Sequence, residues 1–360
     1  MQPDLRPMLA TLTDQPFDDP DWLFETKWDG FRAIAVAEPG HASLYSRNLI
    51  DISRKYPGIC QALAAIAQEA VLDGELVALD AHGRSRFQLL QNAEREATRL
   101  LYCVFDLLYL DGKDLRSLPL LERKAALEAV LPKSPLLLYS AHVVGAGKKA
   151  FARAKGEGEE GVMAKLATSP YLSGERTRNW LKVKAHQEQE VVIVGFTAPR
   201  RSRKYFGALL LAVREGKGWA YAGRAGTGFD AEMLRSVHAK LVPLITDQKP
   251  IAEKVSDAGK TTWVKPKLVA EVKFTEWTSG GEMRHPVFLG LCTDKKATEV
   301  TRELPKPLSQ AKPPTSYRRK PVSRKKQTHS LRVYKNCTLG RSTSSRVIRR
   351  VWRISRPQQR

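Results

Sequence analysis

The apolar segments of this chain are short, and most of them have the length and composition of β-strands. Residues 71–80 (VLDGELVALD) and 100–110 (LLYCVFDLLYL) predict buried strands, whereas residues 61–70 (QALAAIAQEA) predict a helix. Even the longest apolar runs, such as residues 208–213 (ALLLAV), are strand-sized and too short to cross a bilayer. The sequence therefore predicts an α+β protein that does not span a membrane.

Residues 189–303 are richer in strands than the region before them. Their predicted strands are residues 190–196, 207–213, 218–225 and 263–278. One helix lies among them, and its apolar face consists of Met233, Leu234, Val237 and Leu241. Several short strands with one helix favour a small β-barrel, and the OB-fold is a good candidate.

Positive charge is concentrated at the end of the chain. The net charge is +22, and residues 305–360 contain 17 Lys and Arg residues and no Asp or Glu. We expect residues 304–360 to form a basic, disordered tail, because they are rich in Pro and Ser and have little apolar periodicity. The tail is either a DNA-binding extension or sequence from a shifted reading frame. The charge as a whole favours a polyanionic partner, most often nucleic acid.

The four cysteines are scattered, and no two of them form a CxxC pair. A zinc ribbon or a redox motif is therefore disfavoured, and single cysteines suit a reducing cytoplasm. The first ten residues, MQPDLRPMLA, have no apolar core of signal-peptide length. We expect a cytoplasmic protein.

Common nucleotide and hydrolase signatures are absent. Residues 144–150 (VGAGKKA) have Lys149 where a phosphate-binding loop requires Ser or Thr. The glycines of AGRAGTGFD do not have the dinucleotide spacing, and neither HExxH nor GxSxG occurs.

Six short polar clusters do occur, each beside an apolar strand. They are Lys27-x-Asp29-Gly30-x-Arg32, Ser46-Arg47-Asn48, Asp73-Gly74-Glu75, Phe105-Asp106, Glu160-Gly161 with Lys165, and Trp180-Leu181-Lys182-Val183-Lys184. Each cluster alone has an ordinary explanation, such as a β-turn, a solvated strand face or a charged loop. Their combination and order carry more weight than any one of them.

Together the clusters resemble the covalent nucleotidyltransferase superfamily of polynucleotide ligases and mRNA capping enzymes. The segments ETKWDGFR, EGVMAK, WLKVK, YAGRAGTGFD and EWTSGGEMRHPVFLG are most similar to ATP-dependent DNA ligases, in particular the ligase module of bacterial end-joining ligases. The resemblance covers about residues 5–303. It implies an adenylation domain with antiparallel sheets at residues 1–188, an OB-fold domain at 189–303, and a tail outside the family pattern.

The implied reaction is the sealing of 5′-phosphate/3′-hydroxyl nicks through a lysyl-AMP and a DNA-adenylate, in double-strand break repair by non-homologous end joining. The implied partners are nicked or broken duplex DNA and a Ku-like end-binding protein, in the bacterial cytoplasm or nucleoid. We expect a monomer. The resemblance also implies that the barrel closes over the pocket for the first step and then rotates towards DNA.

The resemblance assigns the nucleophile to Lys27, which must be neutral to attack the α-phosphate of ATP. The usual pKa of lysine is about 10.4, and desolvation and nearby cations can lower it. Asp29 would orient the site. Lys182 and Lys184 share one strand face and could reach the same α-phosphate.

The remaining roles also come from the resemblance. Phe105 would stack on the adenine, and Glu75 and Glu160 would hold Mg²⁺ or Mn²⁺. The implied ATP-binding residues are Glu25, Thr26, Arg32, Arg47, Glu75, Phe105, Asp294 and Lys295. The implied DNA-binding residues are Arg200, Arg201, Arg203 and Lys204, in the basic run at residues 199–204.

Two positions depart from the family pattern. Cys292 stands two residues before Asp294-Lys295, where similar ligases usually have an arginine, and Leu49 stands where they often have glycine. Loss of a bidentate phosphate donor predicts a weakened first step with intact sealing of pre-adenylated nicks.

Two other functions remain open. An RNA ligase or capping enzyme would use the same lysyl-nucleotide chemistry, although EWTSGGEMRHPVF favours DNA ligases. An adenylation-impaired or non-catalytic nucleic-acid-binding relative would fit the Cys292 departure and the unusual tail. An NAD⁺-dependent ligase is disfavoured, because no four-cysteine zinc module is visible.

Overall fold

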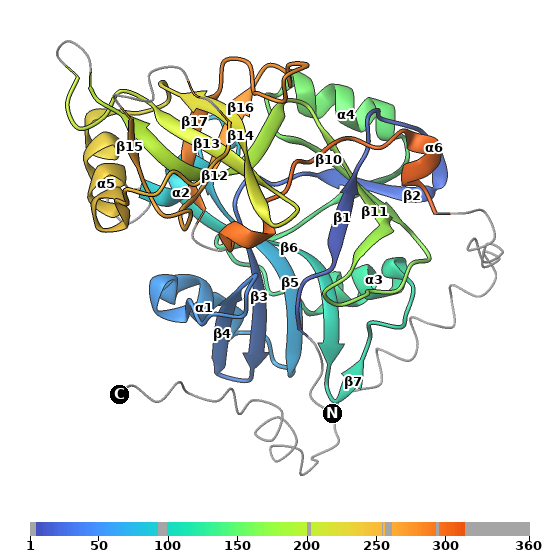
Figure 1. The fold of residues 1–360 in the computed structure, drawn as a ribbon. Coiled ribbons are helices and arrows are strands. Elements are labelled where there is room, and N and C mark those ends of the chain that lie inside the picture. The colour runs from blue at the N-terminus through green and yellow to red at the C-terminus, as the bar shows by residue number, and fades with distance from the viewer. Residues whose placement is uncertain are drawn as a thin grey trace.

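Three β-sheets form most of the protein. The computed structural model describes residues 5–92, 99–199, 203–253, 255, 261–292 and 295–313. The third sheet, which forms a barrel, lies with helix α5 (Ala231–Leu241) at one end of the molecule (Figure 1). Within this part of the chain, no helix is long and apolar enough to cross a membrane.

The first sheet has the strand order β1-β11-β10-β2-β9. Its strands are β1 (Leu9–Leu12), β2 (Asp19–Thr26), β9 (His142–Gly145), β10 (Gly161–Leu166) and β11 (Arg176–Lys184). β1 and β11 are parallel, and the other neighbours are antiparallel. Helix α4 (Gly147–Gly156) packs against β10 and β2.

The second sheet has the order β4-β3-β5-β6-β7, with β8 beside β6. Its strands are β3 (Phe31–Glu38), β4 (His41–Ser46), β5 (Ala70–Leu79), β6 (Arg99–Leu110), β7 (Lys113–Asp114) and β8 (Leu137–Tyr139). Helices α1 (Pro57–Leu63), α2 (Phe87–Asn92) and α3 (Leu120–Val130) pack against it. The predicted strands at 71–80 and 100–110 are confirmed as β5 and β6.

The predicted helix at residues 61–70 is only partly correct. α1 ends at Leu63, and Ala70 begins β5, where it pairs with Ala37 and Leu110. The alanine-rich composition favours a helix locally, but pairing within the sheet overrides that preference. Leu63 and Ile66 are both buried, so the turn between α1 and β5 still contributes to the core.

The third sheet forms the barrel, with the order β14-β13-β12-β16-β17 and β15 beside β12. Its strands are β12 (Gln187–Thr197), β13 (Leu209–Glu215), β14 (Gly218–Ala225), β15 (Thr261–Trp263), β16 (Val269–Phe274) and β17 (Val287–Cys292). Only part of the strand predicted at 263–278 forms, because Val269–Phe274 is β16 and Trp263 ends β15. The two sheets that precede the barrel and the barrel itself agree with the predicted fold, an adenylation domain followed by an OB-fold domain.

The predicted helix of the barrel is confirmed as α5 (Ala231–Leu241), which buries Leu234, Val237 and Leu241. The side chain of Asp230 accepts a hydrogen bond from the backbone N–H of Met233 at 2.7 Å. This contact caps the start of the helix, where backbone donors have no partner within the helix.

The chain returns from the barrel to the first sheet after the short helix η4 (Ala297–Glu299). The backbone N–H of Lys306 donates to the carbonyl of Leu12 at 3.0 Å, and Leu308 packs against the apolar cluster that contains Phe17 and Trp22. Residues 308–311 form α6 (Leu308–Ala311). The tail that the sequence predicts from residue 304 thus has a structured beginning, and residues 314–360 lie outside the described residues.

Candidate active site

All six polar clusters contribute to one pocket between the first two sheets and the barrel. The pocket is lined by Lys27, Asp29, Gly30, Arg32, Arg47, Glu75, Phe105, Glu160, Lys165, Trp180, Lys182 and Lys184 from those clusters. Glu25 and Thr26 line it from β2, and Glu190, Glu271, Cys292, Lys295 and Glu303 line it from the barrel side. The structure therefore brings residues of all six clusters together.

Two glycines of the clusters are required by close backbone contacts. A Cβ atom on Gly30 would lie 2.0 Å from the carbonyl oxygen of Leu76. A Cβ atom on Gly161 would lie 2.1 Å from the carbonyl oxygen of Val183, and Gly161 also has φ +148°. Gly161 directly follows Glu160, and its carbonyl accepts a hydrogen bond from the backbone N–H of Lys27, so Lys27 and Glu160 lie at the same edge of the pocket.

Lys27 directly follows β2, and its backbone N–H donates to the carbonyl of Gly161 at 3.0 Å. Its ammonium forms an ion pair with Glu160. Burial alone lowers the pKa of Lys27, but the carboxylates of Glu160, Glu271 and Asp29 outweigh burial and raise that pKa above its usual value. The lysine is therefore protonated while Glu160 holds it.

Asp29 is held in place by two backbone contacts. Its carboxylate accepts a hydrogen bond from the backbone N–H of Phe87 at 3.0 Å, and its own N–H donates to Ser85 Oγ at 3.0 Å. Burial and the nearby carboxylate of Glu160 raise the pKa of Asp29 to about 6.

Lys182 and Lys184 point to the same side of β11, as the strand alternation predicts. Lys182 Nζ lies 2.8 Å from each carboxylate oxygen of Glu303, and Lys184 Nζ lies 3.5 Å from Glu303 Oε2. Burial lowers the pKa of Lys182 to about 8, although Glu303 opposes the shift. No sequence pattern singles out Glu303, which follows the barrel.

The Phe105 ring lies beside two cations. The guanidinium of Arg32 is 4.5 Å from the ring centroid, and Lys165 Nζ is 4.2 Å from it. Arg32 also forms a two-point contact with Asp73, at 2.5 and 2.6 Å. Arg32 therefore binds a carboxylate in this structure, where the resemblance implies an ATP-binding residue that contacts phosphate or the nick terminus.

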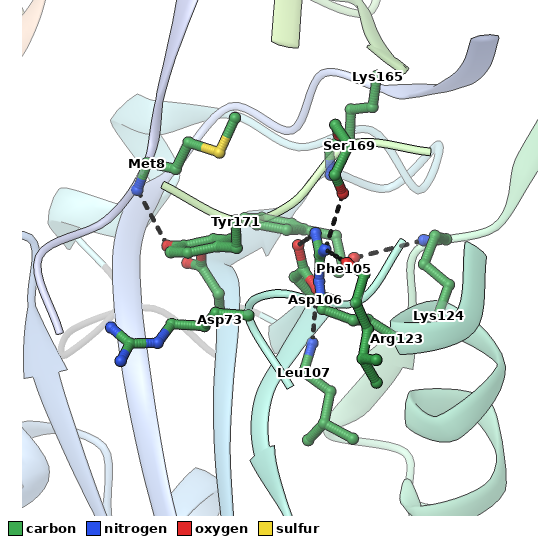
Figure 2. A network of polar contacts seen from close by, with 12 residues as sticks. Met8, Asp73, Phe105, Asp106, Leu107, Arg123, Lys124, Lys165, Ser169 and Tyr171 are labelled. Atoms are coloured by element: carbon green, nitrogen blue, oxygen red, sulfur yellow. Dashed lines mark hydrogen bonds and ion pairs between the residues drawn. The ribbon is translucent and has the colours of Figure 1, made fainter. Parts of the chain in front are cut away.

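A buried ionic network lies next to Phe105 (Figure 2). Arg123 Nε and Nη2 donate to the two carboxylate oxygens of Asp106 at 2.8 and 2.9 Å, and neither side chain is exposed. Glu25 is buried between Lys124 and Lys165, at 2.8 and 2.9 Å. The side chain of Glu25 thus stabilises the wall of the pocket.

Three carboxylates form a candidate site for a divalent cation. Oxygens of Glu160, Glu188 and Glu271 lie within 4.8 Å of one another. Glu188 Oε2 is buried and has no hydrogen-bond partner among the described residues. Burial and neighbouring carboxylates raise the pKa of Glu188 to about 8 and that of Glu271 well above its usual value. Hard oxygen ligands of this kind fit Mg²⁺.

This group differs from the predicted metal ligands in two respects. Glu160 is common to both, whereas Glu75 lines the pocket without belonging to the group. Glu188 and Glu271 come from barrel strands β12 and β16 and were not predicted. The available signal was one or two glutamates within each strand, Glu188 and Glu190 in β12 and Glu271 in β16, which is also the usual pattern of a solvated strand face.

The other predicted residues are distributed as follows. Lys295 forms an ion pair with Glu190, and both line the pocket. Cys292 is buried and also lines it, whereas Asp294, Arg200 and Arg201 lie outside the described residues. Arg203 Nη1 donates to the carbonyl of Gly226 at 2.6 Å, and Lys204 is exposed.

Leu49, the second departure, has a positive φ of 59°. This left-handed conformation costs about 1–2 kcal/mol for a residue other than glycine. The glycine that similar ligases often have at this position therefore has a physical reason.

A lysine among carboxylates and further lysines, in a pocket that a small barrel covers, fits the site that the resemblance to covalent nucleotidyltransferases implies. Comparison with known proteins gives the family. Residues 7–184 match the ATP dependent DNA ligase domain, and residues 202–295 match the ATP dependent DNA ligase C terminal region. The chain belongs to the family of ATP-dependent DNA ligases.

Similar proteins include two curated relatives and one solved structure. The multifunctional non-homologous end joining protein LigD of Pseudomonas aeruginosa is 41% identical over 312 residues, which cover 84% of this chain and 37% of that protein. The corresponding DNA repair protein LigD of Mycobacterium tuberculosis is 40% identical, covering 83% and 40%. The chain thus spans about two fifths of these relatives. A structure of mycobacterial DNA ligase D with ATP and MES is 39% identical with a TM-score of 0.64, covering 83% of this chain and 98% of that one.

Proposed function

We propose that this chain seals 5′-phosphate/3′-hydroxyl nicks in duplex DNA with ATP, in the repair of double-strand breaks by non-homologous end joining. One observation carries the proposal: Lys27 shares a pocket with Lys182, Lys184 and a group of carboxylates. The LigD proteins and the ligase structure with ATP support the same reaction.

In the first step, Lys27 Nζ attacks the α-phosphorus of ATP. A bond between nitrogen and phosphorus forms as the bond to pyrophosphate breaks. Lys182 and Lys184 lie on the face where the α-phosphate develops additional charge, and their ammonium groups stabilise it. The adenylyl group then passes to the 5′-phosphate of a nick, and the adjacent 3′-hydroxyl displaces AMP.

Lys27 cannot attack while Glu160 keeps it protonated. The ion pair between Lys27 and Glu160 must break before the lysine loses its proton, so the Glu160 carboxylate must bind another cation. A Mg²⁺ or Mn²⁺ ion bound by Glu160, Glu188 and Glu271 would supply positive charge to these carboxylates and to the triphosphate. Since Glu188 and Glu271 belong to the barrel, the site is complete only when the barrel covers the pocket.

The proposal also includes two macromolecular partners, DNA and an end-binding protein. We propose that the chain acts on nicked or broken duplex DNA as a monomer in the bacterial cytoplasm, where a Ku-like end-binding protein recruits it. The exposed Lys204 and the neighbouring basic residues are the proposed phosphate-backbone contacts. The LigD relatives act in end joining, which supports this context.

The test is incubation with α-labelled ATP and Mg²⁺, followed by a denaturing gel. We expect a covalent adenylate on the protein that depends on the metal and is lost on chelation. Labelling with GTP in its place would favour capping chemistry. Absence of an adduct, with sealing of pre-adenylated nicks retained, would support the adenylation-impaired alternative that Cys292 suggests.

A further inference from the structure

The segment that leaves the barrel contributes Glu303 to the lining of the pocket. We call residues 301–312 the strap. At its barrel end, Gln189 Nε2 donates to the carbonyl of Thr301 at 3.2 Å, and the backbone N–H of Glu303 donates to Gln189 Oε1 at 2.8 Å. At its other end, Lys306 bonds to Leu12 and Lys312 Nζ lies 2.7 Å from Asp19 Oδ2. Both ends of the strap are therefore anchored.

Glu303 lies near the barrel end of the strap, with its carboxylate against the two lysines of β11. Both of its oxygens lie 2.8 Å from Lys182 Nζ, and one lies 3.5 Å from Lys184 Nζ. The side chains of all three residues are 11–18% exposed. A carboxylate here presents two anionic oxygens to two ammonium groups, which is what an α-phosphate would also present.

The nucleotide and Glu303 need the same two cations. Lys182 uses two of its three N–H donors on Glu303, so it cannot make the same two-point contact with an α-phosphate until Glu303 leaves. The carboxylate is tethered on both sides, so its effective concentration at the lysines is high. A nucleotide phosphate must therefore displace it, and the measured affinity for nucleotide is reduced by that competition.

We propose that Glu303 is an internal competitor of the nucleotide phosphate, and that the strap is an autoinhibitory segment of the active site. This inference rests on the proposed function, because it takes Lys182 and Lys184 to be the phosphate-binding residues. The carboxylate holds the two ammonium groups together in the nucleotide-free protein. It leaves them when a phosphate replaces it.

A purely structural role for Glu303 predicts the opposite behaviour. If its carboxylate only positions the lysines for the phosphate, its removal should weaken nucleotide binding. If it competes, its removal should strengthen binding. The sign of the change in affinity therefore separates the two roles.

The experiment measures binding of α,β-methylene-ATP with Mg²⁺ by calorimetry, using the full chain. This analogue has carbon in place of the bridging oxygen, so Lys27 cannot displace pyrophosphate from it. We expect Glu303→Gln to bind about tenfold tighter than the unsubstituted chain, because a competing charge-assisted contact is lost. Glu299→Gln is the matched control: it removes the same charge from an exposed residue of η4, and we expect its affinity to change less than about twofold.

Glu303→Asp separates contact from charge. It keeps the negative charge but shortens the side chain, so a competitor should also be weakened here, with a smaller gain in affinity. No gain in either Glu303 variant, or a loss, would overturn the proposal. Should Glu303→Gln fail to fold, Glu303→Asp alone decides.

A separate measurement distinguishes this inference from the proposed function. The unsubstituted chain is labelled with α-labelled ATP, and the adduct is measured on a denaturing gel. An adduct without any gain in analogue binding rejects the competitor and leaves the ligase proposal intact. A gain in analogue binding without an adduct keeps the competitor and rejects self-adenylylation.

Discussion

Two groups of ion pairs lie side by side in this protein, and they are built differently. Arg123 and Asp106 are unexposed, and Arg123 Nη1 donates in addition to the carbonyls of Leu118 and Ser169, at 2.6 and 2.9 Å. In the pocket, Lys27 pairs with Glu160 and Lys182 pairs with Glu303, and the lysine side chains are 18% and 15% exposed. Arg123 is surrounded by buried acceptors that stay in place. The lysines of the pocket, in contrast, can bind a ligand in place of their carboxylate partners.

The difference in burial and in hydrogen-bond partners separates charges that stabilise the fold from charges that can bind a ligand. A buried charge that loses its partner is very costly, so a fully hydrogen-bonded pair acts as a fixed part of the fold. A cation at a partly exposed position can change from a protein carboxylate to a phosphate at much lower cost. Substitutions in the first group should therefore change stability, and substitutions in the second should change activity.

The largest expected effect is at Lys27. Lys27→Ala removes the nucleophile, so the covalent adenylate should fall at least about a thousandfold, to background. The free energy of unfolding should change little, because the lost ion pair is one of the exchangeable ones. Labelling with α-labelled ATP and urea denaturation measure the two quantities. Lys240→Ala, at an exposed position on α5, is the control, and equal labelling of both variants would reject the assignment.

The next effect tests the buried pair. Arg123→Met leaves the carboxylate of Asp106 without its cation, and we expect a loss of about 3–5 kcal/mol in the free energy of unfolding. Urea denaturation gives the value. Arg153→Met is the matched control, because Arg153 pairs with Glu157 at a site where both side chains are more than half exposed, and it should cost less than about 1 kcal/mol. Similar losses in both variants would contradict the comparison.

A third test uses pH. The phosphate binds the charged form of Lys182, whose pKa burial lowers to about 8. The affinity for α,β-methylene-ATP should therefore be constant below that pKa and fall as pH rises through it, by up to about tenfold per unit. Calorimetry between pH 6.5 and about 9 checks the profile. In Glu303→Gln the fall should begin at lower pH, because the carboxylate opposes the shift. A flat profile through pH 8 would mean that Lys182 does not titrate there.

The smallest effect is expected at Cys292, where the pocket lacks a cation that similar ligases have. Cys292→Arg should raise the rate of self-adenylylation about tenfold by restoring a charge-assisted phosphate contact. Sealing of pre-adenylated nicks should stay unchanged, so that assay is the internal control. An unchanged rate of self-adenylylation would reject the hypothesis that Cys292 weakens the first step.

The clusters that form the pocket could be predicted because each consists of a few neighbouring residues, and because their order along the chain resembles that of ATP-dependent DNA ligases. Lys182 and Lys184 share a face because side chains alternate along β11. Glu188, Glu271 and Glu303 could not be predicted, because they reach the pocket only when the barrel and the strap pack against the first two sheets. The partner of Arg32 was also unforeseen, since pairing of β3 with β5 brings Asp73 beside it.

The helix predicted at residues 61–70 illustrates the same limit. Local composition favours a helix there, yet Ala70 is in strand β5 because it pairs with Ala37 of the neighbouring strand β3. The fold class, most strands and α5 were correct because their signals are local and periodic. Contacts between segments far apart in the chain depend on how the sheets pack together, so local sequence patterns do not predict them.

The anchored strap has a mechanical consequence. Thr301 is bridged to Arg214 of the barrel, and Lys306 is bonded to Leu12 of the first sheet. Five residues of fully extended chain reach no more than about 18 Å. The segment between Thr301 and Lys306 therefore limits how far the barrel can move from the first sheet. A larger movement requires that the hydrogen bond to Leu12 and the packing of α6 break first.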